Sequence, residues 1–290
     1  MKHLPNLDVL RFFLASLVIL FHVPQLCRNQ ELPFYDGLPI FHRGTEAVFM
    51  FFVLSGFLII RLIYKEKKLG LFSIKAFYIR RMLRILPLYY LIVVFGFTFY
   101  NVILPFFDIP FENNYNLFDG ILLTLFFLPN IFSVLYEPGG ILEILWSIGV
   151  EEQFYLIIAP LFYSFNKDKI FKIIVIFTLV YFLVFHFLLF EEIGKFHFYF
   201  YFLFSGGIVA ILEEKGKLNR LKSSKIVSYT LISITILYFT TNLFITSIIW
   251  LDHLFMVVLF PLFIYSWVTF IMLSIFMIDW EYMVEFNIKK

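Results

Sequence analysis

The sequence alternates between long apolar segments and short polar ones. A helix needs about 20 apolar residues to cross a bilayer, and the apolar segments reach that length. We therefore predict an all-α, polytopic membrane helix bundle of about eight or nine transmembrane helices, forming one membrane-embedded domain over residues 1–290. The apolar segments lie at 7–26, 45–64, 85–104, 117–135, 144–165, 170–190, 196–212, 226–246 and 249–278.

Composition narrows the function classes. Hydrophobic residues make up 61% of the chain, charged residues make up 15%, and the net charge is +2. Soluble domains are about 45–50% apolar and about 25% charged, so a soluble enzyme, a disordered chain and a nucleic-acid binder are excluded. Cys27 is the one cysteine, and metal-ligand spacings are absent from the sequence, so we expect no intrachain disulfide and no bound metal.

Positive charge between the segments sets the expected orientation. The stretch after 45–64 is rich in Lys and Arg, whereas 105–119 holds acidic residues and no basic one. Lys and Arg concentrate in cytoplasmic loops. This pattern predicts a cytoplasmic loop after the second segment and a cytoplasmic N-terminus.

One segment conflicts with a simple scheme in which successive loops alternate between the two sides of the membrane. Basic residues at 167–172 and at 213–225 both lie inside only if 117–135 re-enters the membrane without crossing it. Pro129 and Asn130 interrupt that segment, which favours the re-entrant interpretation.

The first apolar segment carries two polar side chains, Arg11 and His22. Eleven helical residues make three turns plus about 20°, so both side chains share one face, about 16 Å apart along the axis. A charged arginine in a bilayer costs a few kcal/mol or more unless it snorkels, pairs or meets water. Snorkelling of Arg11 and simple packing of His22 are alternatives, but the shared face favours a common polar cavity.

A basic run from Tyr78 to Pro87 enters the third segment. Arg84 lies three residues after Arg81 and four after Arg80, so a helix gathers the three guanidinium groups. Each group is a planar fork that suits phosphate oxygens. The run is typical either of a helix that grips anionic lipid or of a site for a coenzyme with several phosphates.

Two adjacent carboxylates, Glu151 and Glu152, lie within the apolar stretch from Leu145 to Tyr155. On a helix they point about 100° apart, so they cannot face the same way. One of them can face a cavity while the other pairs with a cation or reaches the interface. The alternative is a water-facing start of a helix near the membrane surface.

Small residues occur within two other apolar segments, as Ser55-Gly56 and as Ser205-Gly206-Gly207. Small residues allow helix backbones to approach closely in membranes. We therefore predict packing contacts at both places, in preference to a nucleophilic role for Ser55.

Four motifs taken together resemble the membrane acyltransferase 3 family, integral-membrane enzymes that O-acylate sugars and related acceptors. They are Leu7-Asp8-Val9-Leu10-Arg11 leading to His22, Phe51 to Leu58, Arg80 to Pro87, and Leu145 to Tyr155 with Pro160. Gly149 stands where the family usually has Ser. The sequence after Ile278 lacks the pattern of the family's usual last span, so we expect that span to be missing.

The resemblance implies acyl transfer from an acyl-CoA, most often acetyl-CoA, which is a substrate and not a permanently bound cofactor. The implied acceptor is a hydroxyl of a cell-envelope or exported carbohydrate or of a lipid-linked glycan, and the implied location is the bacterial inner membrane, among its lipids.

The resemblance also implies roles for particular residues. His22 would act as general base or transient acyl carrier, with Arg11 as its paired residue, and we expect Glu151 or Glu152 to orient the imidazole. The coenzyme-binding residues would be Arg80, Arg81 and Arg84.

Two other functions fit the same residues. Intramembrane Arg, His and Glu also build the ion pathways of transporters and flippases. An inactive, truncated family member is the third possibility. Turnover of labelled acetyl-CoA discriminates among the three.

Overall fold

The computed structural model describes residues 5–29, 31–111, 113–189, 194–219, 224–240 and 249–267. The regular elements within these ranges are helices, which confirms the all-α prediction. Five of these helices are long and apolar enough to cross a membrane, as expected for a multi-pass membrane protein. They are Leu7–Arg28, Gly44–Lys68, Ile74–Phe106, Lys169–Phe187 and Ile249–Trp267. The larger number of eight or nine spans stays a prediction.

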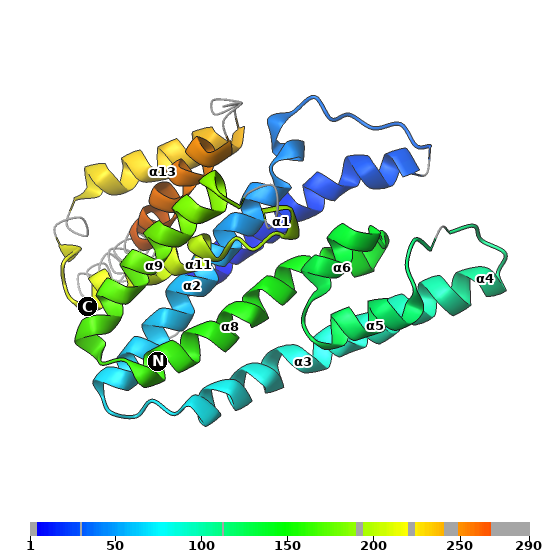
Figure 1. The fold of residues 1–290 in the computed structure, drawn as a ribbon. Coiled ribbons are helices and arrows are strands. Elements are labelled where there is room, and N and C mark those ends of the chain that lie inside the picture. The colour runs from blue at the N-terminus through cyan, green and yellow to red at the C-terminus, as the bar shows by residue number, and fades with distance from the viewer. Residues whose placement is uncertain are drawn as a thin grey trace, which may run out of the picture. The chain divides into compact units, whose positions relative to one another are not determined.

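The helices group into two compact units (Figure 1). The first unit comprises Met1–Arg61 with Phe202–Lys290, and the second comprises Leu62–Tyr201. The first unit contains α1 (Pro5–Asn29), η1 (Pro39–His42), most of α2 (Gly44–Lys68), most of α11 (Phe200–Glu214), α13 (Lys225–Thr240) and the helix Ile249–Trp267. The second contains α3 (Ile74–Thr98), η2 (Phe99–Ile103), α4 (Leu104–Phe106), α5 (Leu117–Leu125), α6 (Pro129–Tyr136), α7 (Gly140–Ile144), α8 (Trp146–Ser164), α9 (Lys167–Phe187) and η3 (Gly194–Phe196).

Glycines bring α2 and α11 into backbone contact in the first unit. A Cβ atom built on Gly56 would collide with the carbonyl of Leu203, and one on Gly206 would collide with the carbonyl of Val53. Only glycine allows this approach, because every other residue places a side-chain atom there. The prediction of close helix packing at both small-residue stretches is therefore confirmed.

Two arginines of the first unit, Arg43 and Arg61, are largely buried and form ion pairs. Arg43 donates from Nη1 to Oε1 of Glu46 at 2.7 Å. Arg61 donates to Glu213 at 3.0 Å and to Glu214 at 3.2 Å, which ties α2 to the end of α11. Such pairing lowers the cost of taking charged groups out of water.

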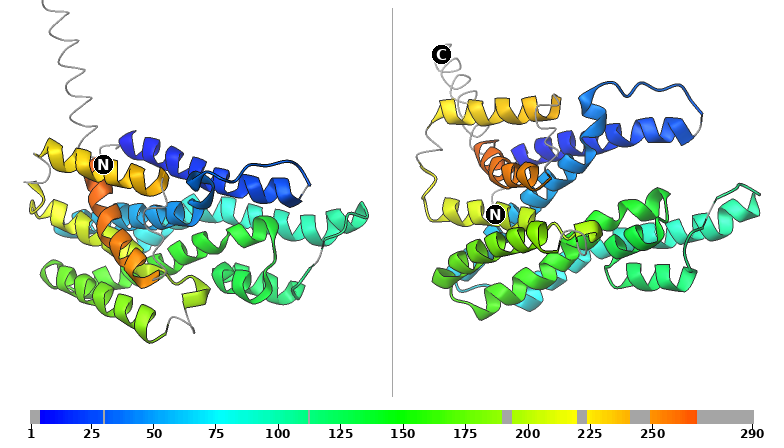
Figure 2. Two further views of the ribbon diagram at one scale, coloured as in Figure 1. Left: turned by 90° about the horizontal axis from the view of Figure 1, so that it is seen from above. Right: turned by 45° about the horizontal axis from the view of Figure 1, so that its top comes forward.

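A long helical segment forms one side of the second unit. The hydroxyl of Ser73 caps α3 by accepting from the N–H of Ala76, and α3 then continues through η2 into α4. Both views in Figure 2 show α5 running back along this segment.

The predicted segment 117–135 is two short helices rather than one. Helix α5 has 9 residues and α6 has 8. At about 1.5 Å per residue, each is roughly half as long as a membrane span. Phe127 adopts a positive φ of 59° between them, and Pro129, which lacks an N–H, starts α6. The expected interruption at Pro129 is confirmed, and re-entry into the membrane stays a prediction.

The later segments also differ from the sequence prediction in their bounds. The stretch predicted at 196–212 divides into η3 and α11, which begins at Phe200. The ends of the last two predicted segments, beyond residues 240 and 267, lie outside the described residues.

Candidate active site

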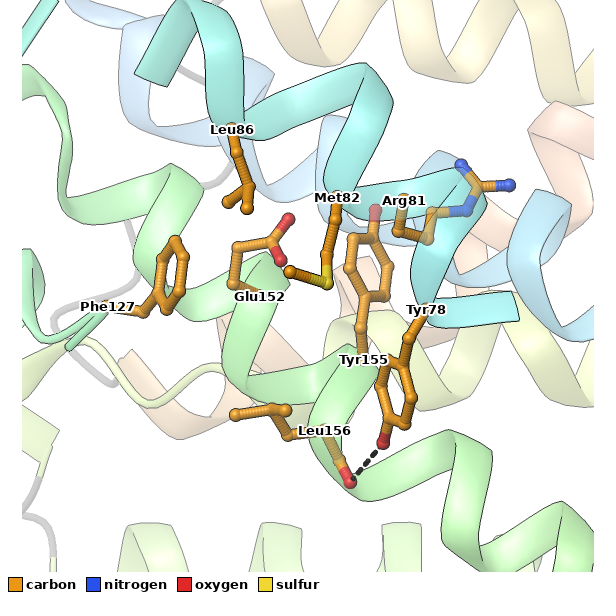
Figure 3. Close-up of a pocket in the computed structure, with 8 residues that line it drawn as sticks. All are labelled: Tyr78, Arg81, Met82, Leu86, Phe127, Glu152, Tyr155 and Leu156. Atoms are coloured by element: carbon orange, nitrogen blue, oxygen red, sulfur yellow. Dashed lines mark hydrogen bonds between the residues drawn. The ribbon is translucent and has the colours of Figure 1, made fainter. Parts of the chain in front are cut away.

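A pocket in the second unit is lined by two of the predicted motifs (Figure 3). Its volume is about 300 Å³. Helix α3 supplies residues of the basic run, α8 supplies residues of the carboxylate motif, and the break between α5 and α6 supplies Phe127. The lining residues are Tyr78, Arg81, Met82, Leu86, Phe127, Glu152, Tyr155 and Leu156.

Glu152 provides a buried carboxylate in this pocket. The residue is 8% exposed, and its Oε1 atom has no hydrogen-bond partner among the described residues. In Figure 3 the carboxylate lies among the side chains of Met82, Leu86 and Phe127. A buried polar atom without a partner is costly, so a ligand that donates a hydrogen bond there would remove the penalty.

Glu151 has a different environment from its neighbour. Its Oε2 atom accepts a hydrogen bond from the Tyr155 hydroxyl at 3.1 Å. One carboxylate thus faces the pocket while the other is paired, and the division follows from their angular separation on α8.

Arg81 supplies the positive charge of the pocket. Its guanidinium lies over the rings of Phe77 and Tyr155, with 5.9 Å to each ring centroid. Its Nε atom is buried and has no hydrogen-bond partner in the described part of the chain. The aromatic faces favour the cation electrostatically, and the guanidinium retains donors for an anion.

The other two arginines of the basic run lie on the exposed side of α3. Arg80 donates from Nη2 to both carboxylate oxygens of Glu66, at 2.9 and 3.0 Å. Arg84 is exposed and does not line the pocket. Of the three candidate coenzyme-binding residues, the structure therefore places only Arg81 in the pocket wall.

A hydrogen-bond network holds the break between α5 and α6 against α8. The Nε2 atom of Gln153 donates to the Phe127 carbonyl at 2.8 Å and to Oδ1 of Asn130 at 2.7 Å. Asn130 in turn donates to the Phe196 carbonyl at 2.8 Å. In the sequence, Asn130 stood out only as an interruption of an apolar segment. No sequence pattern indicated a role for Gln153.

The same contact explains the glycine that departs from the family pattern. A Cβ atom on Gly149 would lie 2.6 Å from two ring atoms of Pro129. Gly149 therefore lets α8 approach the break closely enough for Phe127 to line the pocket.

Substituting Gln153 with leucine tests this network. We expect Gln153→Leu to destabilise the protein by about 1–3 kcal/mol, because buried polar partners lose their hydrogen bonds. Thermal unfolding in detergent measures the effect. Gln25→Leu, at an exposed position of α1, is the matched control, and equal melting temperatures for the two variants would refute the role of Gln153.

Arg11 and His22 both lie on α1, in the first unit. Arg11 donates to Oδ1 of Asp8 at 2.9 Å, and both side chains are partly exposed. His22 is half-buried, with the Phe21 ring edge-on at 5.2 Å between centroids. The continuous helix supports their shared face, while their catalytic roles stay predictions.

Comparison with known proteins agrees with the motifs. The model of a family described as an acyltransferase domain matches residues 4–283. The chain belongs to this family. The resemblance inferred from the four motifs is thereby confirmed.

Curated relatives cover only parts of the chain. A peptidoglycan O-acetyltransferase of Listeria monocytogenes is 28% identical over 169 residues, which is 54% of this chain and 24% of the relative. An uncharacterised protein of Haemophilus influenzae is 32% identical over 145 residues, which is 47% of this chain and 56% of the relative. The chain thus spans about a quarter of the Listeria protein and about half of the Haemophilus protein. No solved structure matches the chain significantly.

Proposed function

We propose that this membrane acyltransferase transfers an acyl group, most often acetyl, from acyl-CoA to a hydroxyl of a cell-envelope or exported carbohydrate. The observation that carries the proposal is the pocket where Arg81 of α3 and Glu152 of α8 meet. Two family motifs far apart in the sequence converge there on one cavity. The name of the Listeria relative supports a carbohydrate acceptor.

In the proposed reaction, the acceptor hydroxyl attacks the thioester carbonyl. A C–O bond forms, the C–S bond breaks, and the coenzyme leaves as its thiol. His22 takes the hydroxyl proton and returns it to the sulfur, a role for which imidazole is suited near neutral pH. In this proposal Glu151 or Glu152 orients the imidazole and offsets the positive charge it gains, and Arg11 is the paired residue on the same helix as His22. In an alternative form of this mechanism, His22 itself carries the acyl group from the donor to the acceptor.

The donor would be held on the cytoplasmic side through its phosphates. Arg81 offers guanidinium donors at the pocket, and Arg80 and Arg84 extend positive charge along the exposed side of α3. The carbohydrate hydroxyl would be presented near His22. We propose that the protein lies in the bacterial inner membrane with a cytoplasmic N-terminus, which the basic residues after the second apolar segment support.

Purified protein incubated with labelled acetyl-CoA and a glycan acceptor tests the function. Acyl transfer, or slow hydrolysis of the thioester without acceptor, is the expected result. Solute transport without coenzyme turnover would favour a transporter. If the protein shows neither coenzyme turnover nor transport, it is an inactive member of the family.

The arginine of the pocket allows a more specific prediction. We expect Arg81→Ala to raise the KM for acetyl-CoA by about 10- to 100-fold, because a charge-assisted contact to phosphate is lost. Initial-rate kinetics measure the change. Lys75→Ala, which removes an exposed cation near the start of the same helix, is the control. A KM unchanged by Arg81→Ala would remove this residue from the coenzyme site.

A further inference from the structure

The pocket is apolar apart from its arginine, its carboxylate and two tyrosines. The Tyr78 hydroxyl donates to the Leu156 carbonyl at 3.3 Å, and the Tyr155 hydroxyl donates to Glu151. Both tyrosine protons are therefore engaged within the protein. Oε1 of Glu152, by contrast, is buried and has no hydrogen-bond donor among the described residues.

This arrangement specifies the chemistry of a ligand. The walls around Glu152 are the side chains of Met82, Leu86, Phe127 and Leu156. A ligand that fills the pocket needs apolar groups along its length and an N–H or O–H donor opposite Glu152. It also needs an anion near Arg81, whose Nε atom lacks an acceptor in the described part of the chain.

The size of the pocket limits how much of a ligand it holds. A volume of about 300 Å³ lies at the lower end of small-molecule sites, which range from about 300 to 1,000 Å³. A slender chain fits this space, whereas a whole nucleotide coenzyme does not.

We propose that the pocket binds the pantetheine arm of the acyl-CoA donor, with Glu152 accepting a hydrogen bond from an amide N–H of the arm. This inference rests on the proposed function, because it presumes an acyl-CoA donor. The arm alternates methylene and methyl groups with two amides, which matches apolar walls that hold one buried acceptor. Its phosphate end would lie toward Arg81, and the nucleotide would lie outside the pocket.

Glu152 therefore discriminates in favour of donors with an amide in the arm. A donor with an ester oxygen in place of the N–H would leave the carboxylate unsatisfied and would set two oxygens against each other. Sites built around a buried hydrogen bond reject analogues that lack the matching group.

The test measures how well the purified protein uses three acetyl donors. They are acetyl-CoA, acetyl-pantetheine without the phosphates, and the acetyl-pantetheine analogue in which ester oxygens replace both amide N–H groups. We expect the wild-type protein to prefer acetyl-pantetheine over its ester analogue by about 10-fold or more in kcat/KM. Equal use of the two donors would overturn the proposal, and this comparison needs no variant.

Variants assign the effect to the residue. Glu152→Leu should raise the KM for acetyl-pantetheine by about 10-fold or more and remove the preference over the ester analogue. Glu152→Gln keeps a carbonyl acceptor and should retain part of the preference. Arg81→Ala should impair the use of acetyl-CoA more than the use of acetyl-pantetheine, which lacks the phosphates. Glu143→Gln, at an exposed position of α7, is the control for loss of a carboxylate.

The outcomes separate this inference from the proposed function. If wild-type protein turns over acetyl-CoA while Glu152→Leu lowers kcat equally for all donors, Glu152 serves the acceptor or the proton and the arm is bound elsewhere. If wild-type protein neither binds nor turns over acetyl-CoA, the proposed function itself fails.

Discussion

Replacing His22 with alanine is expected to abolish acyl transfer while coenzyme binding persists. A positioned general base contributes about 10²- to 10⁴-fold to rate, and a covalent acyl carrier would contribute more because the route is lost without it. Transfer of labelled acetyl groups and equilibrium binding of acetyl-CoA, measured on the same preparation, separate the two effects. Donor binding should be retained because the pocket of Arg81 and Glu152 is built from other helices.

A second histidine provides the matched control. His42 is exposed, and its ring bonds through Nε2 to the Asp36 carbonyl at 2.8 Å. His42→Ala should transfer acetyl groups at nearly the wild-type rate. Near-normal acetylation by His22→Ala would refute the assignment of His22, and loss of coenzyme binding by that variant would indicate a structural role.

Adding one methyl group at Gly56 is expected to destabilise the first unit by about 3 kcal/mol or more. Overpacking an interior costs about 1–3 kcal/mol, and here the new Cβ meets the backbone of Leu203, which cannot rotate away. Helices α2 and α11 would have to separate. Thermal or denaturant unfolding of Gly56→Ala in detergent measures the loss.

Gly207 offers a control on α11. A Cβ atom there would meet the end of the Ile60 side chain, which can change rotamer. Both variants gain about 0.5–1 kcal/mol of helix propensity, so that gain cancels in the comparison. Gly207→Ala should therefore cost clearly less than Gly56→Ala. A larger loss for Gly207→Ala would contradict the backbone contact at Gly56.

Local pattern predicted most of the long helices. The predicted segments 7–26 and 45–64 lie within α1 and α2, because long apolar runs become helices when the backbone has to satisfy its own hydrogen bonds. The break at Phe127 is held by contacts with α8, where Gln153 donates to the Phe127 carbonyl. Hydropathy reflects only local composition, so it predicted residues 117–135 as one apolar segment.

The candidate site shows a similar division. Helical spacing predicted that Glu151 and Glu152 face different directions, and the structure places Glu152 in the pocket and pairs Glu151 with Tyr155. The spacing also predicted that a helix brings Arg80, Arg81 and Arg84 together in one cluster. It did not predict that Glu66 binds Arg80, because that pair joins different helices.

The residue pattern by itself determined that the chain is an α-helical membrane protein, which family it belongs to, and which charged side chains lie within its apolar segments. These properties follow from chain composition and from angles within a single helix. Only the tertiary structure decided that Arg81 and Glu152 line one cavity, with Phe127 held against them by Gln153. That arrangement arises from packing among helices distant in sequence, which no local periodicity encodes.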